Sequence, residues 1–142
     1  MSVAEIIDPS GGRLPFDARP AVLIVEDQMR LRERLVHQVM ELGIMPAVAT
    51  KGTDAVRLVK RERHDLILLD GLLPDMHGFE VARILRALDP AYRPRIAIVT
   101  GIYKGTRYEN EARLKYGVDN YILKPVSHEA LANVVWQARR IL

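Results

Sequence analysis

Five side chains suited to acid, metal or phosphate chemistry follow directly after four short apolar runs. They are Glu26, Asp27, Asp70, Thr100 and Lys124. If the ends of the runs meet, the three carboxylates repel one another and raise one another's pKa unless a cation lies among them. Mg²⁺ suits such a group, because it prefers a few carboxylates together with waters and a phosphate oxygen. The residue types therefore predict a magnesium site that also receives a phosphate group.

The remaining side chains predict what the site does to that phosphate. Lys124 supplies a positive charge suited to a phosphoryl group, and Thr100 supplies a hydroxyl donor. Asp70 is the candidate acceptor, because an aspartate can form an acyl phosphate. Taken singly, each motif has an ordinary interpretation as a capping or turn residue. Their placement after four different runs favours one shared site.

Strands and helices alternate along the chain and position these side chains. The apolar runs lie at 21–25, 45–49, 66–69, 96–99 and 120–123, and apolar stripes with helical spacing lie at 29–42, 79–88, 107–116 and 128–142. The runs "LILL" and "IAIV" have no polar alternation, which is typical of parallel strands covered on both faces. The order predicts an α/β three-layer sandwich with five strands and five helices. In such a sheet, ligands bind beyond the carboxyl ends of the strands.

Length and composition exclude several classes of protein. The 142 residues suit one domain, and the net charge of +3 is spread along the chain, so we expect no direct nucleic-acid binding. Cysteine is absent, and no apolar run approaches the roughly 20 residues of a membrane span. We therefore predict a soluble, cytoplasmic protein without a membrane segment. Glycines and prolines at the start predict a flexible N-terminal extension over 1–19, and residues 20–142 form the predicted domain.

Four motifs together resemble the receiver domain of two-component response regulators. They are "VLIVEDQ", "LILLDGLLPDMHGFEVAR", "AIVTG" and "YILKPV", and each follows or ends a different predicted strand. The resemblance covers about residues 20–142. It implies a flavodoxin-like fold with a parallel sheet of strand order 2-1-3-4-5, in which the first and third strands are neighbours.

The resemblance also implies a role for each residue of the site. Asp70 looks like the phosphoacceptor, and Glu26 and Asp27 look like the acidic pair that binds Mg²⁺ together with Asp70 and the backbone carbonyl of Leu72. Lys124 would contact the phosphoryl group. The expected donor is a phosphohistidine on a sensor histidine kinase or a phosphotransfer protein. The chain would then be no enzyme in the usual sense, since it would catalyse only its own phosphotransfer and dephosphorylation.

A switch of surface is the output that the resemblance implies. Thr100 would contact the phosphoryl group, and Tyr121 stands where the family places a rotating aromatic switch. The fourth helix, the fifth strand and the last helix would present the changed surface to a downstream protein or a second copy. Trp136 and Arg140 point away from the apolar stripe of the last helix, so they predict an interface there. The alternative for Trp136 is that it lies flat against its own helix or a neighbouring loop.

Several features depart from the family pattern or favour rival functions. Gly71 follows Asp70 where the family usually has a bulky residue, which predicts a more open approach to the acceptor. Val126 replaces the Phe that usually follows the Lys-Pro pair, and the segment from Thr100 to Lys124 is longer than usual. The first rival is a pseudo-receiver that only docks or dimerises. The second is a phosphatase or flavin-binding protein on the same fold. The four histidines show no ligand spacing and are predicted at the surface.

Overall fold

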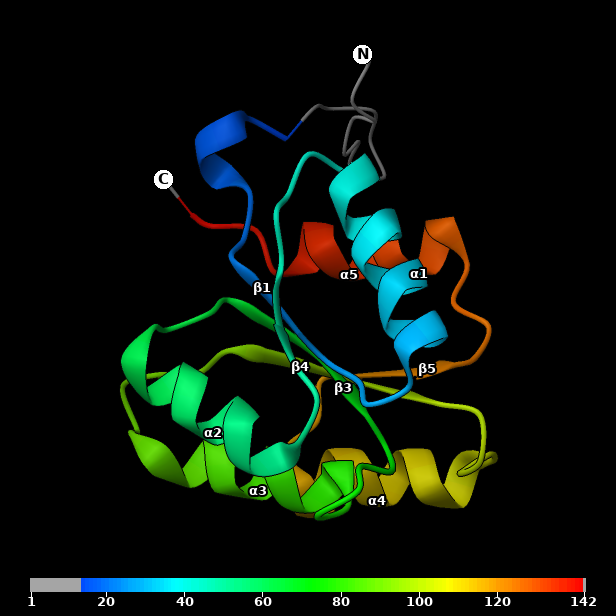
Figure 1. Ribbon diagram of the computed structural model, residues 1–142. Coiled ribbons are helices and arrows are strands. Elements are labelled where there is room, and N and C mark those ends of the chain that lie inside the picture. The colour runs from blue at the N-terminus through cyan, green and yellow to red at the C-terminus, as the bar shows by residue number, and fades with distance from the viewer. Residues whose placement is uncertain (1–13, 142) are drawn as a thin grey trace.

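The computed structural model describes residues 14–141 (Figure 1). Its elements are, in chain order, the 3-10 helix η1 (Phe16–Ala18), β1 (Val22–Val25), α1 (Met29–Glu41), β2 (Ala47–Ala49), α2 (Gly52–Arg61), β3 (Leu66–Asp70), α3 (Gly78–Leu88), β4 (Arg95–Thr100), α4 (Thr106–Tyr116), β5 (Asn120–Leu123) and α5 (His128–Gln137). Within this range, no helix combines the length and the apolar character needed to cross a membrane.

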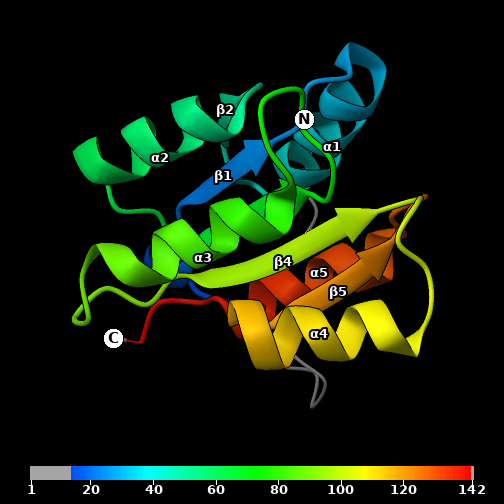
Figure 2. The ribbon, with the colours of Figure 1, turned by 90° about the horizontal axis from the view of Figure 1, so that it is seen from below.

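The five strands form one parallel sheet of order β2-β1-β3-β4-β5. Helices α1 and α5 cover one face, and α2, α3 and α4 cover the other (Figures 1 and 2). The predicted flavodoxin-like three-layer sandwich is therefore confirmed. Because β1 and β3 are hydrogen-bonded neighbours, with Val25 opposite Leu69, the residues that follow β1 lie beside the end of β3.

Two hydrophobic cores lie on the two faces of the sheet, since successive side chains of a strand point to opposite sides. In β1, Val22 and Ile24 pack toward α1 and α5, whereas Leu23 and Val25 pack toward α2 and α3. All five residues of β3 are buried. This explains why "LILL" is apolar without alternation, as a strand covered by helices on both faces requires.

The two ends of the domain differ from the predicted boundaries. Residues 1–13 of the predicted extension lie outside the described residues, but Leu14 and Ala18 are buried in the core on the α1 and α5 face. The short turn η1 places both apolar side chains toward that core, so the packed part begins before residue 20. At the other end, α5 stops at Gln137 instead of 142. The backbone N–H of Arg140 donates to the carbonyl of Ala18 rather than continuing the helix.

A side chain from the segment after β3 caps helix α2. The carboxylate of Asp75 accepts hydrogen bonds from the backbone N–H groups of Gly52 (2.9 Å) and Thr53 (3.0 Å), which have no partner inside the helix. Desolvation acts to raise the pKa of Asp75, but the bonds from Thr53 and Gly52 outweigh it, so the pKa lies below its ordinary value. The cap ties α2 to the segment that carries the end of β3.

Replacing Asp75 by alanine is expected to lower the free energy of unfolding by about 1 kcal/mol at pH 7, because two N–H groups lose their acceptor. The folded-state pKa of Asp75 is lowered, so its contribution is present above the ordinary aspartate pKa and is lost as the pH falls through the lowered value. The stability difference between wild type and variant should therefore shrink at acidic pH. Urea unfolding followed by circular dichroism at several pH values measures both effects.

Asp54→Ala is the matched control, because Asp54 lies in the first turn of the same helix and makes an exposed pair with Arg57 at 3.3 Å. This change should cost less than about 0.5 kcal/mol. Equal losses for the two variants would contradict the capping role of Asp75.

Candidate functional site

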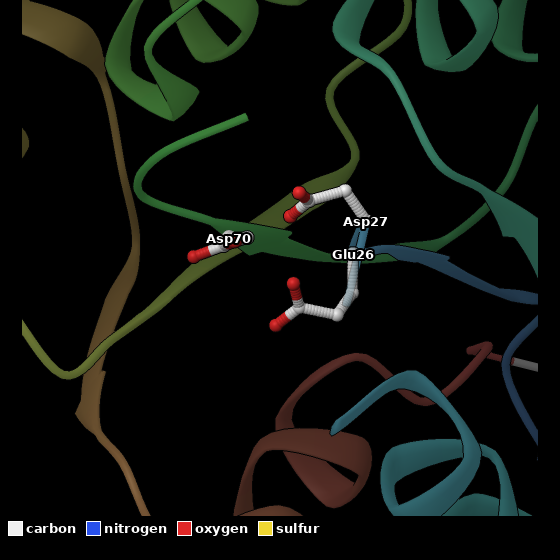
Figure 3. Close-up of side chains that lie close together, drawn as sticks. All are labelled: Glu26, Asp27 and Asp70. Carbon is white, nitrogen blue, oxygen red and sulfur yellow. The ribbon is translucent and has the colours of Figure 1, made fainter. Parts of the chain in front are cut away.

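Three carboxylates meet at the carboxyl edge of the sheet. Glu26 and Asp27 follow β1, Asp70 ends β3, and each offers an oxygen within 4.8 Å of the others (Figure 3). Glu26 and Asp27 extend to opposite sides of the chain, with Asp70 beside them (Figure 3). Glu26 is only 1% exposed and Asp70 8%, whereas Asp27 is exposed to solvent. The predicted convergence of the three acids is confirmed as geometry.

Lys124 reaches this group from the end of β5. Its Nζ lies 2.7 Å from Oε1 of Glu26 and 3.4 Å from Oδ1 of Asp70. Burial raises the pKa of Glu26, and the hydrogen bond from Lys124 opposes that shift. Burial acts to lower the pKa of Lys124, but the bond to Glu26 and the charges of Asp70 and Glu26 outweigh it, so that pKa is raised. The ammonium group is thus the counterion of two buried carboxylates.

The donor set fits a hard divalent cation. Among residues 14–141, Lys124 pairs with two of the carboxylates, and the Arg32 guanidinium donates to the backbone carbonyls of Glu26 and Asp27. The three carboxylates still outnumber these two cations, so negative charge is in excess. Oδ1 of Asp70 accepts from the backbone N–H of Leu72 (3.4 Å) and from Lys124, while Oδ2 accepts no hydrogen bond from residues 14–141. Exposed Asp27 leaves the group reachable from solvent. The role of the Leu72 carbonyl as a ligand stays a prediction.

Thr100 ends β4 beside this group and is buried. Its Oγ1 accepts hydrogen bonds from the backbone N–H groups of Ile102 and Tyr103, both at 3.2 Å. The hydroxyl oxygen therefore closes the turn after β4, and its own proton is left to donate to another acceptor. An acceptor that drew the Thr100 hydroxyl toward itself would weaken the two hydrogen bonds that close this turn.

Tyr103 is the part of the site that the sequence analysis missed. Its ring lies against Gly71, where a Cβ atom would be 3.3 Å from Cδ2 of Tyr103 and 3.2 Å from Oγ1 of Thr100. The predicted open approach beside Gly71 is therefore wrong on this side, because the tyrosine and the threonine occupy the space. A glycine after the acceptor and an aromatic residue three positions after Thr100 are the two sequence signals for this contact.

Tyr121 is connected to the same turn. Its hydroxyl donates to the backbone carbonyl of Tyr103, and its ring stacks on Phe79 with centroids 6.5 Å apart. Burial raises the pKa of Tyr121 to about 12, so the hydroxyl is a donor at neutral pH. The aromatic residue that the sequence singled out thus contacts the turn after β4, and its rotation stays a prediction.

The predicted interface residues of the last helix make contacts within the chain. Trp136 is half-buried against the core, and the guanidinium of Arg139 lies 4.2 Å from its ring centroid. Arg140 lies beyond α5, and its Nε donates to Asp65 at 2.8 Å. Of the two interpretations left open for Trp136, the structure supports packing against its own chain.

At two further side chains the structure departs from what the sequence predicted. His64 was predicted at the surface but is buried before β3. Gln38 is buried on the core-facing side of α1, and its Nε2 donates to the carbonyl of Val126 at 2.9 Å. This bond holds the segment after the cis Lys124–Pro125 peptide, so α1 helps to place the lysine. A polar residue inside the apolar stripe of α1 was the available signal.

Residues 22–136 match the family described as the response regulator receiver domain, and the chain belongs to this family. The DNA-binding response regulator MtrA of Mycobacterium tuberculosis is 36% identical over 123 residues, which cover 86% of this chain and 52% of the relative. The transcriptional regulatory protein CusR of Escherichia coli is 33% identical over 120 residues, which cover 84% and 51%. The chain therefore spans about half the length of these relatives.

Solved structures agree with this assignment. The receiver domain of a signal transduction histidine kinase from Syntrophus aciditrophicus is 32% identical with a TM-score of 0.73, and the match covers 84% of this chain and 89% of that one. The receiver domain of a sensor histidine kinase from Pseudomonas aeruginosa, with a magnesium ion coordinated in its active site cleft, is 28% identical with a TM-score of 0.74 over 84% of this chain and 97% of that one.

Mg²⁺ is expected to raise the melting temperature of the wild type, because binding to the folded state alone stabilises it. A concentration roughly a hundredfold above Kd adds about 2.7 kcal/mol. Asp27→Ala should lose most of this increase, since it removes one carboxylate from an exposed position without disturbing the buried pair. Thermal unfolding with and without MgCl₂ measures the effect.

The control for this measurement is Asp17→Ala, which removes an exposed acid of η1, before β1 and thus at the opposite edge of the sheet, and should keep the full response. Choline chloride at equal ionic strength separates binding from salt screening. The same Mg²⁺ response in Asp27→Ala as in wild type would contradict the site.

Proposed function

We propose that this domain accepts a phosphoryl group on Asp70 in a Mg²⁺-dependent reaction, and that it relays the change through the surface formed by α4, β5 and α5. The observation that carries the proposal is the state of the Asp70 carboxylate. One oxygen is held by Leu72 N–H and Lys124, and the other accepts no hydrogen bond from the described residues. An aspartate fixed in this way has one oxygen available as a nucleophile.

The proposed donor is a phosphohistidine on a sensor histidine kinase or a phosphotransfer protein. Oδ2 of Asp70 attacks the phosphorus in line with the phosphorus–nitrogen bond. That bond breaks as the new phosphorus–oxygen bond forms, and the imidazole leaves with the electron pair and takes a proton. Lys124 neutralises negative charge on the phosphoryl oxygens, and the Thr100 hydroxyl donates a hydrogen bond to one of them. The product is an acyl phosphate on Asp70.

Glu26, Asp27 and Asp70 are the residues that would hold Mg²⁺, with the Leu72 carbonyl as the further ligand implied by the family. When bound, the ion supplies positive charge that offsets the repulsion between these carboxylates and the incoming phosphoryl group. Glu26 and Asp27 take no part as nucleophiles in this proposal. Their task is to keep the cation beside Asp70.

The proposed switch follows from the hydrogen bonds around Thr100. If its hydroxyl turns toward the phosphoryl group, the N–H groups of Ile102 and Tyr103 lose or weaken their shared acceptor. Tyr103 is also held by the Tyr121 hydroxyl, so the change extends to β5. The two conformations differ in population before phosphorylation, and the modification favours one of them.

The partner of the switched surface is proposed to be a protein. MtrA is described as DNA-binding, but this chain spans about half of that relative, and its basic residues are spread over the sequence. We propose a downstream protein or a second copy on α4, β5 and α5, with no direct contact to nucleic acid. We also propose that the domain turns over no other substrate, because Leu72 stands where a phosphatase with an aspartate nucleophile needs its second acid.

Incubation with MgCl₂ and acetyl phosphate is expected to add the mass of one phosphoryl group to the intact wild-type protein. Asp70→Asn should show no such addition, because the amide is a poor nucleophile in the same position. Omitting Mg²⁺ or adding EDTA should suppress the adduct as well. Intact-protein mass spectrometry measures all three.

Asp17→Asn is the matched control, since it replaces an exposed acid before β1, at the opposite edge of the sheet, and should be phosphorylated like the wild type. Folded wild type that forms no adduct with either acetyl phosphate or beryllium fluoride would favour the pseudo-receiver that only docks. Sustained hydrolysis of a phosphate ester would instead indicate an enzyme.

A further inference from the structure

A second concave site lies beside the phosphorylation site, between the start of α3, the segment after β4, and α4. Its volume is about 270 Å³. Helices α3 and α4 lie next to each other on this side of the sheet (Figure 2). None of the three carboxylates at the ends of β1 and β3 lines this site, which makes it separate from the candidate metal site.

Four aromatic rings form a continuous wall of this pocket. The ring of Phe79 lies 5.5 Å from that of Tyr103 and 5.4 Å from that of Tyr116, and Tyr103 lies 5.4 Å from Tyr108, all between centroids. The Tyr103 hydroxyl and Nδ1 of His77 are 3.0 Å apart, so this contact helps to position the central ring. Tyr108 is 39% exposed, so the wall continues to the surface.

Two carboxylates stand on the rim of the aromatic wall. Glu80 pairs with Arg83 at 2.8 Å and Glu111 with Lys115 at 3.9 Å, and all four side chains are well exposed. Lys115 also lies 5.4 Å from the ring of Tyr116, so a cation already approaches one edge of the wall. Exposed pairs between helix neighbours contribute little free energy, so a better-placed cation can replace them.

We propose that this pocket binds the guanidinium group of an arginine side chain presented by a partner protein. A guanidinium group is planar, stacks on aromatic faces and donates paired hydrogen bonds to carboxylates. The aromatic wall can stack on the plane of the guanidinium group, and the two carboxylates of the rim can accept its hydrogen bonds. An anionic group is disfavoured by Glu80 and Glu111, and a wholly apolar group would make no use of either carboxylate.

If Asp70 is phosphorylated as proposed, the occupancy of the pocket is coupled to the acceptor site through Tyr103. The backbone N–H of Tyr103 donates to Thr100, its carbonyl accepts from Tyr121, and its ring is the centre of the wall. Turning Thr100 toward a phosphoryl group removes one of these restraints, which displaces the ring. The arginine therefore binds the unphosphorylated state more tightly, and by linkage it opposes phosphorylation to the same extent.

The probe is N-acetyl-arginine amide, titrated without Mg²⁺ or phosphate into the ¹⁵N-labelled protein. N-acetyl-citrulline amide has nearly the same shape without the charge and serves as the matched ligand. The arginine probe should give saturable shifts of the amide signals of residues 77–80 and 103–116. The citrulline probe should bind at least about fivefold more weakly. Equal shifts with both probes, or arginine shifts centred elsewhere, would overturn the proposal.

Variants of the rim test the same site without disturbing the core. Glu80→Gln and Glu111→Gln should each weaken binding of the arginine probe about fivefold, whereas Glu129→Gln, an exposed acid on α5, should leave it unchanged. Tyr108→Ala should weaken it as well, because it removes an exposed ring. Unchanged affinity in the two rim variants and in Tyr108→Ala would show that the pocket is not the binding site.

The coupling is measured last, by repeating the titration with Mg²⁺ and beryllium fluoride. The arginine probe should then bind at least about threefold more weakly than without the analogue. If the affinity for the arginine probe is unchanged on a protein that carries the analogue, the proposed coupling is contradicted. If no analogue binds, the proposed phosphorylation fails, while the first titration still decides whether the pocket takes a guanidinium group.

Discussion

Two buried carboxylates, Glu26 and Asp70, face one ammonium group, Lys124, at the carboxyl edge of the sheet. Burying an ionised carboxylate is unfavourable unless it is paired, so the lysine is as necessary to the fold here as to any chemistry. Adding exposed Asp27 leaves negative charge in excess. The constraint that makes this edge costly therefore makes it receptive to a divalent cation, and in the proposed function that cation would offset the charge of an incoming phosphoryl group.

The segment after β4 connects this charge arrangement to the surface. Thr100 holds the backbone of Tyr103, Tyr103 fills the space beside Gly71, and Tyr121 binds the carbonyl of Tyr103. A change in the partner of one hydroxyl therefore reaches both the aromatic wall and β5. The connection consists of a few hydrogen bonds on a loop that packs against the sheet, and in the proposed switch phosphorylation shifts this loop between two conformations.

The fold and most of the site could be predicted, because they depend on local patterns and on one rule of parallel sheets. Uninterrupted apolar runs identified the buried strands β3 and β4, and the meeting of strand ends placed Asp70 near Glu26 and Asp27. The missed features are contacts between residues distant in sequence. Asp75 caps α2, Gln38 binds the carbonyl of Val126, and Arg140 binds Asp65. No periodicity encodes these pairs, since each depends on how two finished elements approach one another. The end of α5 was mispredicted for the same reason.

Site mapping of the phosphorylated protein tests the central claim most directly. An acyl phosphate is reduced by borohydride to an alcohol, which converts a phosphorylated aspartate to homoserine. After treatment with Mg²⁺ and acetyl phosphate, followed by borohydride and peptide mass spectrometry, homoserine should be found at position 70 and at no other aspartate. Homoserine at position 27, or reduction products spread over exposed acids with none at position 70, would contradict the assignment of Asp70 as the acceptor and of Glu26 and Asp27 as its cation-holding neighbours.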